Sequence, residues 1–172
     1  MTRGLYRFQA SGQSHCVTFS CHHRLPKLMD NQAREEFLHA LESERRRLGA
    51  RVYGFVVMPE HVHLLLSEPE RGTLADLIRG VKLTSAKRRR QQLGKGDETP
   101  LWQSRYYDRN LRSYADFVEK LRYIHRNPVK RGLCGSPEEW LWSSFRHYLT
   151  GETCVVEIES EWTARRRSAN ER

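Results

Sequence analysis

Two β-rich stretches separated by only two residues constrain the fold of this chain more than any other feature. Residues 51–58 and 61–67 are rich in strand-forming residues, and only Pro59 and Glu60 lie between them. Two such runs with so short a connection are typical of neighbouring strands joined by a tight turn. The sequence therefore predicts an antiparallel pair.

A strand and a helix are expected before this pair. Residues 15–21 form a short run of strand formers. Apolar residues then recur at helical spacing from about residue 31 to residue 48, with Asp30 or Asn31 as a capping residue and Gly49 as the end. The first part of the chain thus reads as strand, helix, strand, strand.

After the pair, a second helix is expected from residue 74 into a basic cluster at 87–90. A fourth strand is expected at 105–111, and a third helix at about 114–126, closed by Asn127 and Pro128. The order β, α, β, β, α, β with a further helix predicts an α+β chain with a ferredoxin-like antiparallel sheet and helices on one face.

The length of 172 residues fits a single domain with its own hydrophobic core. We expect this domain to span residues 1–149 and to begin with a loosely held arm at 1–14. Residues 150–172 are polar and charged, and we expect a charged C-terminal tail that is partly disordered or regulatory.

The charge balance favours a polyanionic partner. Lysine and arginine number 30 against 21 acidic residues, which gives a net charge of +9 with histidine counted neutral. Nucleic acid is the first candidate. No apolar run approaches the roughly 20 residues of a spanning helix, and no signal peptide is visible, so we expect a cytoplasmic protein without a membrane partner.

The four cysteines show no CxxC pair, and we expect free thiols. A metal site formed by Cys16, Cys21, His22 and His23 is the alternative. It is disfavoured because Cys16 and Cys21, five residues apart, would lie on opposite faces of a strand.

The sharpest local motif is His61-Val62-His63. In a strand, the period of two places both imidazoles on one face, roughly 6 to 7 Å apart along the backbone. Two imidazoles at this spacing can bind one cation, although they do not identify the metal. The alternative is two half-buried strand histidines satisfied by hydrogen bonds.

The third helix carries a second polar feature. Its apolar side includes Tyr114, whereas Asp116, Lys120, Tyr123 and Asn127 form a separate stripe. Asn127, one turn after Tyr123, offers an amide oxygen as a further metal ligand. The alternative is a surface tyrosine followed by a residue that only ends the helix.

Basic residues alternate with aromatic residues between positions 87 and 109, a pattern suited to phosphates and unpaired bases. The candidate DNA-binding residues are Lys87, Arg88, Arg89, Arg90, Trp102, Arg105 and Arg109, together with the neighbouring Tyr106 and Tyr107. The alternative is that Trp102 and one of the two tyrosines belong to the core.

Five blocks stand out along the chain, and together they cover about Val17 to Tyr148. They are VTFSCHHRLPKL, FVVMPEHVHLLLSEP, LWQSRYYDRNLRS, YIHRNPVKRGL and WLWSSFRHYL. These blocks resemble, in the same order, those of the REP-associated tyrosine transposases. This family belongs to the single-tyrosine branch of the His-hydrophobic-His (HUH) transposases and relaxases.

The resemblance implies an enzyme that cleaves and rejoins single-stranded DNA next to hairpin-forming palindromic repeats. It implies Tyr123 as the nucleophile, which forms a 5′-phosphotyrosine intermediate, and a divalent metal, Mg or Mn, held by His61, His63 and Asn127. It implies no nucleotide cofactor and a monomer or a homodimer. Two other functions stay open: a catalytically silent hairpin-binding protein and a metal-dependent nuclease that uses water.

Overall fold

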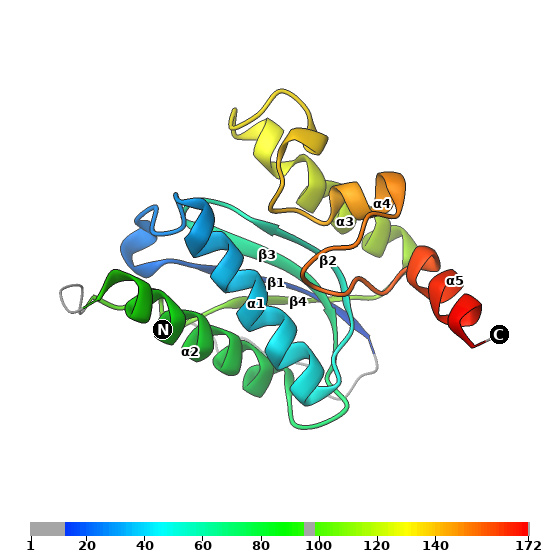
Figure 1. The fold of residues 1–172 in the computed structure, drawn as a ribbon, viewed down its shortest axis with the longest axis horizontal. Helices are drawn as coiled ribbons and strands as arrows, with labels where there is room; N and C mark the ends of the chain where they lie inside the picture. Colours follow the sequence, from blue (N-terminus) through cyan, green and yellow to red (C-terminus); the bar gives the residue numbers. More distant parts are fainter. Residues whose placement is uncertain (1–12, 95–98, 172) are drawn as a thin grey trace.

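The computed structural model describes residues 13–94 and 99–171, which form an α+β fold (Figure 1). The strands are β1 (Ser14–Ser20), β2 (Val52–Val57), β3 (His61–Ser67) and β4 (Tyr107–Leu111); the helices are α1 (Asn31–Leu48), α2 (Leu74–Leu93), α3 (Tyr114–Lys130), α4 (Phe145–Thr150) and α5 (Glu161–Asn170), with short 3₁₀ turns η1 (His22–Arg24) and η2 (Pro137–Glu139). The N-terminal arm expected at 1–14 lies outside the described residues, except for Gln13 and Ser14.

The four strands form one antiparallel sheet in the order β2-β3-β1-β4. β2 and β3 are adjacent, and the pairing of Val57 with Val62 confirms the tight connection between the two β-rich stretches. β1 lies between β3 and β4, as the split β-α-β arrangement requires. The ferredoxin-like sheet expected from the order of elements is therefore confirmed.

Helices α1 and α2 pack side by side on one face of this sheet (Figure 1). Alternate residues of β3 point toward them and are fully buried, as the strand period of two requires. Asp30 caps α1 by accepting a hydrogen bond from the backbone of Ala33, and Gly49 ends the helix with a positive φ of 68°. The main core contains Val62, Leu64, Leu66, Phe19, Phe37 and Leu77.

Helix α3 covers the opposite face of the sheet, where a second, smaller core includes Leu65, Ile124 and Trp140. The approach is close at Gly54 of β2. A Cβ atom at this position would lie 2.5 Å from Cδ1 of Leu121, closer than real Cβ contacts allow. Glycine thus lets α3 pack directly on the strand next to the one that carries the two histidines.

Helix α3 is longer than the sequence predicts. It was expected to end near residue 126, but it continues through Pro128 to Lys130. Proline lacks a backbone N–H and crowds the preceding turn, which is costly inside a helix. Here Pro128 lies in the last turn, and the helix closes after it with hydrogen bonds from Arg131 N to Asn127 O and from Leu133 N to Pro128 O. The extension keeps Asn127 on the same helical surface as Tyr123.

The C-terminal segment, for which the sequence predicts a charged tail, contains a helix and packs on the sheet. Residues 151–160 pack against the edge strand β2, where Glu159 N donates to Val52 O, and α5 follows. Val156 and Ile158 are buried in the main core. The apolar residues of this segment are scattered in the sequence, and only the fold brings these two into contact with other core residues. Part of the segment thus has regular structure and buried side chains, whereas its partial disorder and its regulatory role stay predictions.

All four cysteines are free, as expected. Cys16 lies in the smaller core and Cys21 in the main core, so the two thiols face opposite sides of the sheet. This arrangement disfavours the alternative metal site at the start of the chain. No helix among the described residues has the length and apolarity needed to cross a bilayer.

A buried cluster of charged side chains lies at the start of β1. The imidazole of His15 is fully buried between Asp108 at 2.9 Å and Glu68 at 3.2 Å. Burial lowers the pKa of His15, but the hydrogen bonds and charges of the two carboxylates outweigh it and raise the pKa above the ordinary value. By contrast, burial lowers the pKa of His147, whose imidazole binds Ser160 and the backbone oxygen of Glu152.

We predict that His15→Gln lowers the free energy of unfolding mainly at acidic pH, by about 3 kcal/mol, because buried carboxylates lose their cation. A raised pKa in the folded state means that the stabilisation is complete below the unfolded value of about 6.5 and is lost as pH rises through the folded value. Urea unfolding at pH 5.5 and 8.5 measures the difference. His147→Gln is the matched control and should show the opposite pH trend; a His15→Gln effect that grows with pH would contradict the prediction.

Candidate functional site

The two histidines of the HxH motif lie side by side on the face of β3 that α3 covers. Their rings meet edge to face with centroids 4.7 Å apart, and the two Nε2 atoms are 3.0 Å apart. Both side chains are buried. The expectation from the strand period, that His61 and His63 share one face, is confirmed.

The other nitrogen of each ring has a polar partner that fixes the orientation of the ring. Nδ1 of His61 donates to Oε1 of Glu60 at 3.0 Å, and Nδ1 of His63 lies 2.7 Å from Oγ1 of Thr18. Oε1 of Glu60 also accepts a hydrogen bond from Arg131 at 2.8 Å. This pattern, in which the outer nitrogen is held so that the inner nitrogen presents a lone pair, is typical of metal-binding histidines.

Burial keeps both imidazoles neutral. It lowers the pKa of His61, although Glu60 opposes the shift, and together with the neighbouring His61 it lowers the pKa of His63 to about 3. The carboxyl of Glu60 is also partly buried, but its interactions with His61 and Arg131 hold its pKa below the ordinary value. Neutral imidazoles at neutral pH are the protonation state that a metal ion requires.

Helix α3 brings Tyr123 and Asn127 to the same place. The ring of Tyr123 packs edge to face on His63 with centroids 5.3 Å apart, and the side chain is 39% exposed. The amide of Asn127 is buried, with Nδ2 lying 3.1 Å from Nε2 of His63. A rotation of this amide by 180° would present its oxygen at the same position. His61, His63, Tyr123 and Asn127 thus lie together, as the sequence predicts. One expectation for α3 is wrong: Tyr114 is 82% exposed and does not belong to the apolar side of the helix.

These side chains open onto a cavity of about 310 Å³ with a positively charged rim. It is lined by Thr18, Ser20, Arg24, His61, His63, Tyr123, Asn127, Lys130 and Arg131. Arg24 belongs to η1, where His23 and Arg24 have φ values of 53° and 56°, a left-handed conformation that costs L-residues energy. The backbone is therefore held in a strained turn beside this cavity, and the basic side chains of Arg24, Lys130 and Arg131 in the lining suit an anionic ligand.

The residues present fit a divalent metal. Two nitrogens bound to one ion at about 2.1 Å and at a right angle would be about 3.0 Å apart, which matches the separation of the two Nε2 atoms. Among the described residues, no three histidine, cysteine or acidic side chains gather into a metal site. The remaining ligands would therefore be the Asn127 oxygen, water or substrate oxygens, which suits a hard ion such as Mg or Mn.

The family of the chain follows from its sequence and agrees with this site. The profile of a family described as "Transposase IS200 like" matches residues 9–127, which include both histidines, the tyrosine and the asparagine. The chain belongs to this family. The match ends at Asn127, so α4, α5 and the segment that covers β2 lie beyond it.

Two curated members of this transposase family are similar to the chain. A protein of Haemophilus influenzae named as a REP-associated tyrosine transposase is 31% identical over 104 residues, which cover 56% of this chain and 59% of the relative. The REP-associated tyrosine transposase of Escherichia coli K12 is 26% identical over 140 residues, 81% of this chain and 80% of the relative. The resemblance seen in the five sequence blocks is therefore confirmed.

Solved structures share the fold of this IS200-like transposase. A REP-associated tyrosine transposase bound to a REP hairpin superposes with a TM-score of 0.71 at 23% identity, covering 92% of this chain and 93% of the other. A protein of Deinococcus radiodurans described as a transposase gives a TM-score of 0.50 at 22% identity, covering 72% and 95% of the two chains. The expected fold class agrees with both.

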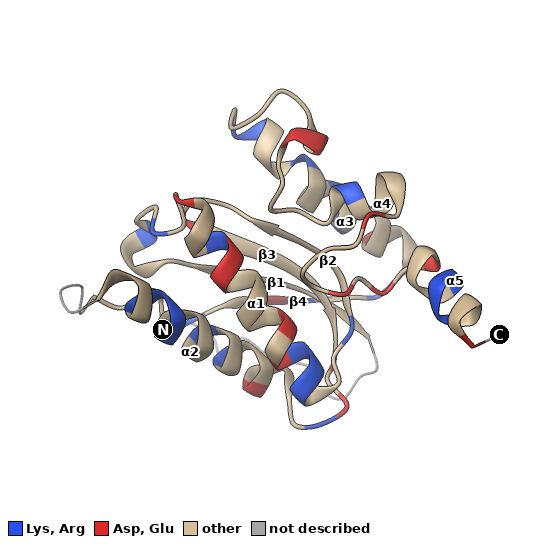
Figure 2. Ribbon diagram, in the orientation of Figure 1, with Lys and Arg blue, Asp and Glu red and all other residues tan. Residues whose placement is uncertain are grey.

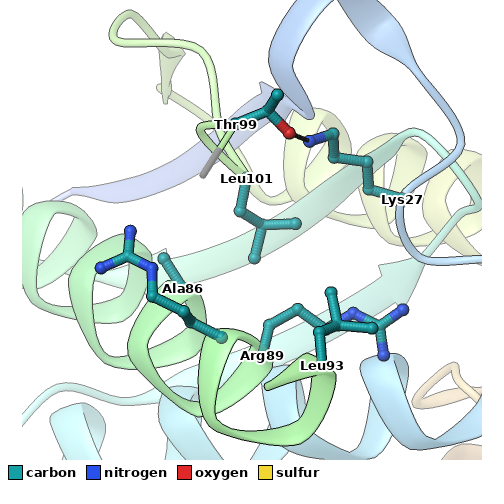
Figure 3. A pocket seen from close by; sticks show the side chains of 7 residues that line it. Lys27, Ala86, Arg89, Leu93, Thr99 and Leu101 are labelled. Carbon is teal, nitrogen blue, oxygen red and sulfur yellow. Dashed lines mark hydrogen bonds between the residues drawn. The ribbon is translucent and has the colours of Figure 1, made fainter. Parts of the chain in front are cut away.

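The basic cluster at the end of α2 lies on the other face of the sheet from the histidines, although near the same end. Arg88 pairs with Glu36 at 2.9 Å and Arg89 pairs with Asp30 at 2.6 Å, whereas Lys87 and Arg90 are exposed. Figure 3 shows this end of α2 beside Leu101, with Lys27 hydrogen-bonded to Thr99. The pocket there encloses about 90 Å³, too little for a nucleotide.

The remaining candidate DNA-binding residues divide into two groups. Trp102 is 7% exposed, packs on Phe19 and donates its Nε1–H to Ser85, so its ring cannot stack on a base. This corrects its assignment as a DNA-binding residue and agrees with the alternative that it belongs to the core. Arg105 and Arg109 are exposed; Arg109 pairs with Cys16 across β1 and β4 and therefore faces the α3 side.

The sequence does not reveal the residues that orient the site residues from segments distant in the chain. Thr18 and Arg131 come from β1 and from the end of α3, and only the strand register and the helix packing bring them to the histidines. His125 is buried on α3, and its Nε2 lies 2.8 Å from Oγ of Ser144, which in turn accepts a hydrogen bond from Phe55 N of β2. No local signal marks these partners, because each depends on a contact between distant segments.

Proposed function

We propose that this protein is a transposase of the REP-associated tyrosine type that cleaves and rejoins single-stranded DNA next to hairpin-forming repeats. The observation that carries the proposal is the cavity in which Tyr123, the two imidazoles and the Asn127 amide meet, because a nucleophile and a metal-ligand set from separate elements converge there. Family membership supports it.

His61, His63 and Asn127 would hold a divalent ion, Mg or Mn. When bound, the ion supplies positive charge that offsets the charge of the phosphate in the transition state. Glu60 orients the ring of His61 and Thr18 orients the ring of His63, so the Nε2 lone pairs of the two histidines point to one place.

Tyr123 provides the nucleophile. Its phenolic oxygen forms a bond to the scissile phosphorus, and the bond from phosphorus to the 3′ oxygen breaks. The phenol gives up its proton and the departing 3′ oxygen gains one, so the products are a 5′-phosphotyrosine and a free 3′-hydroxyl. Attack by another 3′-hydroxyl reverses the step and rejoins strands without a nucleotide cofactor.

The basic rim of the cavity binds and orients the phosphate. Arg24 has no carboxylate within ion-pair distance among the described residues, and Lys130 lies 5.6 Å from the centroid of the Tyr123 ring. Arg131 is already bound to Glu60, so its role is to fix the outer hydrogen bond of His61. Arg24 and Lys130 are thus the two side chains free to contact phosphate oxygens.

The hairpin substrate rests on similarity. The solved relative is described as bound to a REP hairpin, and the curated relatives are named for REP elements. The net charge of +9 suits a folded DNA strand, as do the lysine and arginine positions on α2 and α3 (Figure 2), several of which are exposed.

Denaturing gels with fluorescent hairpin oligonucleotides and Mg or Mn test the proposal. The expected result is a cleaved strand and a covalent protein–DNA adduct of equal yield. Cleavage without an adduct would identify a nuclease that uses water, and binding without cleavage would identify a catalytically silent hairpin-binding protein. Either outcome would reject the transesterase.

We predict that DNA affinity falls steeply with salt and that a hairpin with a single-stranded flank binds at least about tenfold tighter than a blunt duplex of equal length. With six phosphate contacts, affinity should fall about 10³-fold between 50 and 200 mM salt. Fluorescence anisotropy with both ligands measures these values. Equal affinity for the blunt duplex at 150 mM salt would contradict the preference, since unpaired bases would then contribute nothing.

A further inference from the structure

A second hollow lies along the outer surface of α3, next to the candidate site. It encloses about 540 Å³ and is lined by Tyr114, Ala115, Val118, Glu119, Arg122, Tyr123, Arg126 and Lys130. We call it the α3 groove. Tyr123 and Lys130 line both this groove and the cavity that contains the histidines. The nucleophile therefore stands where the two hollows meet.

The α3 groove carries a row of positive charge. Arg122, Arg126 and Lys130 are four residues apart along the helix and therefore lie on one surface of it. All three are exposed, and among the described residues none has a carboxylate within ion-pair distance. Glu119, the acidic residue of the lining, pairs with Lys120 at 3.0 Å. The row is thus available to bind successive phosphates.

An exposed aromatic ring lies at the end of the α3 groove that is formed by the first turn of α3. Tyr114 is 82% exposed, and its ring is nearly parallel to that of Phe117, with an angle of 8° and centroids 6.4 Å apart. Ala115 and Val118 add apolar surface beside it. A solvent-exposed ring next to apolar side chains offers a surface on which an unpaired base can stack.

We propose that the α3 groove binds the single-stranded DNA flank that leads away from the scissile phosphate. Arg122 and Arg126 contact its phosphates, and Tyr114 stacks on a base. Tyr123 follows Tyr114 by nine positions in α3, so the part of the groove between the two rings is about 14 Å long and accommodates roughly four stacked nucleotides. The proposal rests on the proposed function, since it names the part of the substrate that this surface holds.

A second copy of the chain fits the α3 groove less well. A symmetric interface would bring the same surface of each subunit together. The positive row of each subunit would then lie against the positive row of the other, with Glu119 as the acidic residue of the lining. Charge complementarity therefore favours a nucleic acid strand.

The test compares the wild-type protein with a triple variant, Tyr114→Ala, Arg122→Gln and Arg126→Gln, on hairpins whose 5′ or 3′ flank grows from zero to eight nucleotides. For one of the two flanks, wild-type affinity in fluorescence anisotropy should rise up to about four nucleotides and then level off. The variant should lose this gain, with a 5- to 150-fold loss from the missing ring alone. Its slope of log affinity against log salt should be lower by about 1.4, as expected for two lost single-strand phosphate contacts.

Two controls separate this proposal from the proposed function. Arg165→Gln removes an exposed charge from α5 and should leave the length dependence unchanged. Hairpins without a flank should bind both proteins equally. A triple variant that keeps the wild-type length dependence for both flanks would overturn the groove proposal, even if the adduct forms. Loss of the length dependence without any adduct in the wild type would reject only the transesterase chemistry. The groove would instead belong to a dimer interface if the wild type is a dimer, the triple variant is a monomer and the DNA affinity of the wild type does not depend on flank length. This outcome would overturn the proposal.

Discussion

Replacing Tyr123 by phenylalanine is expected to abolish both cleavage and adduct formation, with a rate loss of at least about 10⁴-fold. The change removes one oxygen and keeps the ring, which packs on His63 and lies near Lys130. The variant should therefore fold like the wild type, and its affinities for the metal and for the hairpin should stay within about twofold of the wild-type values. Single-turnover cleavage on denaturing gels and anisotropy on the same substrate measure the two effects separately.

Tyr107→Phe is the matched control because Tyr107 is a second exposed phenol on the histidine side of the sheet. It is 54% exposed on β4 and pairs with Thr18, so it lies on the same face of the sheet as the two histidines. Its replacement should leave the adduct intact. If Tyr123→Phe still formed an adduct, peptide mapping would locate it, and attachment at Tyr107 would reject Tyr123 as the nucleophile.

The parts of the fold that the sequence predicted are those with local physical causes. The bounds of α1 were correct because Asp30 caps its start and Gly49 adopts the left-handed conformation at its end. The strand pair of β2 and β3 was visible because its connection is too short for any other arrangement. Each of these features depends on neighbours in the chain, so it can be recognised without the tertiary structure.

The parts that differed depend on tertiary packing. Pro128 predicts the end of α3, but the helix tolerates a proline in its last turn, where Asn127 contacts His63 of the sheet and the nearby His125 contacts Ser144. For Trp102 the sequence allowed either DNA binding or a place in the core, and the structure shows that it lies in the main core beside Phe19. The polar C-terminal segment contributes Ile158 to the core, which no run of hydrophobic residues announced.

The candidate site follows the same division. The periods of strand and helix were enough to predict that His61 and His63 share a face and that Tyr123 and Asn127 share a stripe. The hydrogen bonds that orient the two imidazoles were not predictable, because they come from Thr18 on another strand and from the Glu60–Arg131 pair. The sequence thus indicated which residues gather at the candidate site, and the structure adds the contacts that position them.

His61→Ala and His63→Ala are each expected to reduce cleavage at least about 10³-fold and to weaken Mn binding strongly, while hairpin affinity falls less than about threefold. Each change removes a ligand and the electrostatic catalysis that depends on it, whereas the basic side chains that contact phosphates remain. Isothermal titration with Mn, anisotropy and single-turnover cleavage provide the three readouts.

Matched variants show whether this loss is specific to the metal site. His39→Ala removes an exposed histidine of α1 and should change none of the three readouts. Thr18→Val keeps the size of the side chain but removes the hydroxyl 2.7 Å from Nδ1 of His63, and it should weaken Mn binding by about 10- to 100-fold. Because His63 is buried, an alanine there leaves a cavity, so His63→Gln provides a second variant of more similar volume. Cleavage by His61→Ala or His63→Gln at the wild-type rate in the presence of a chelator would exclude the metal role, since catalysis would then depend on Tyr123 and the basic rim alone.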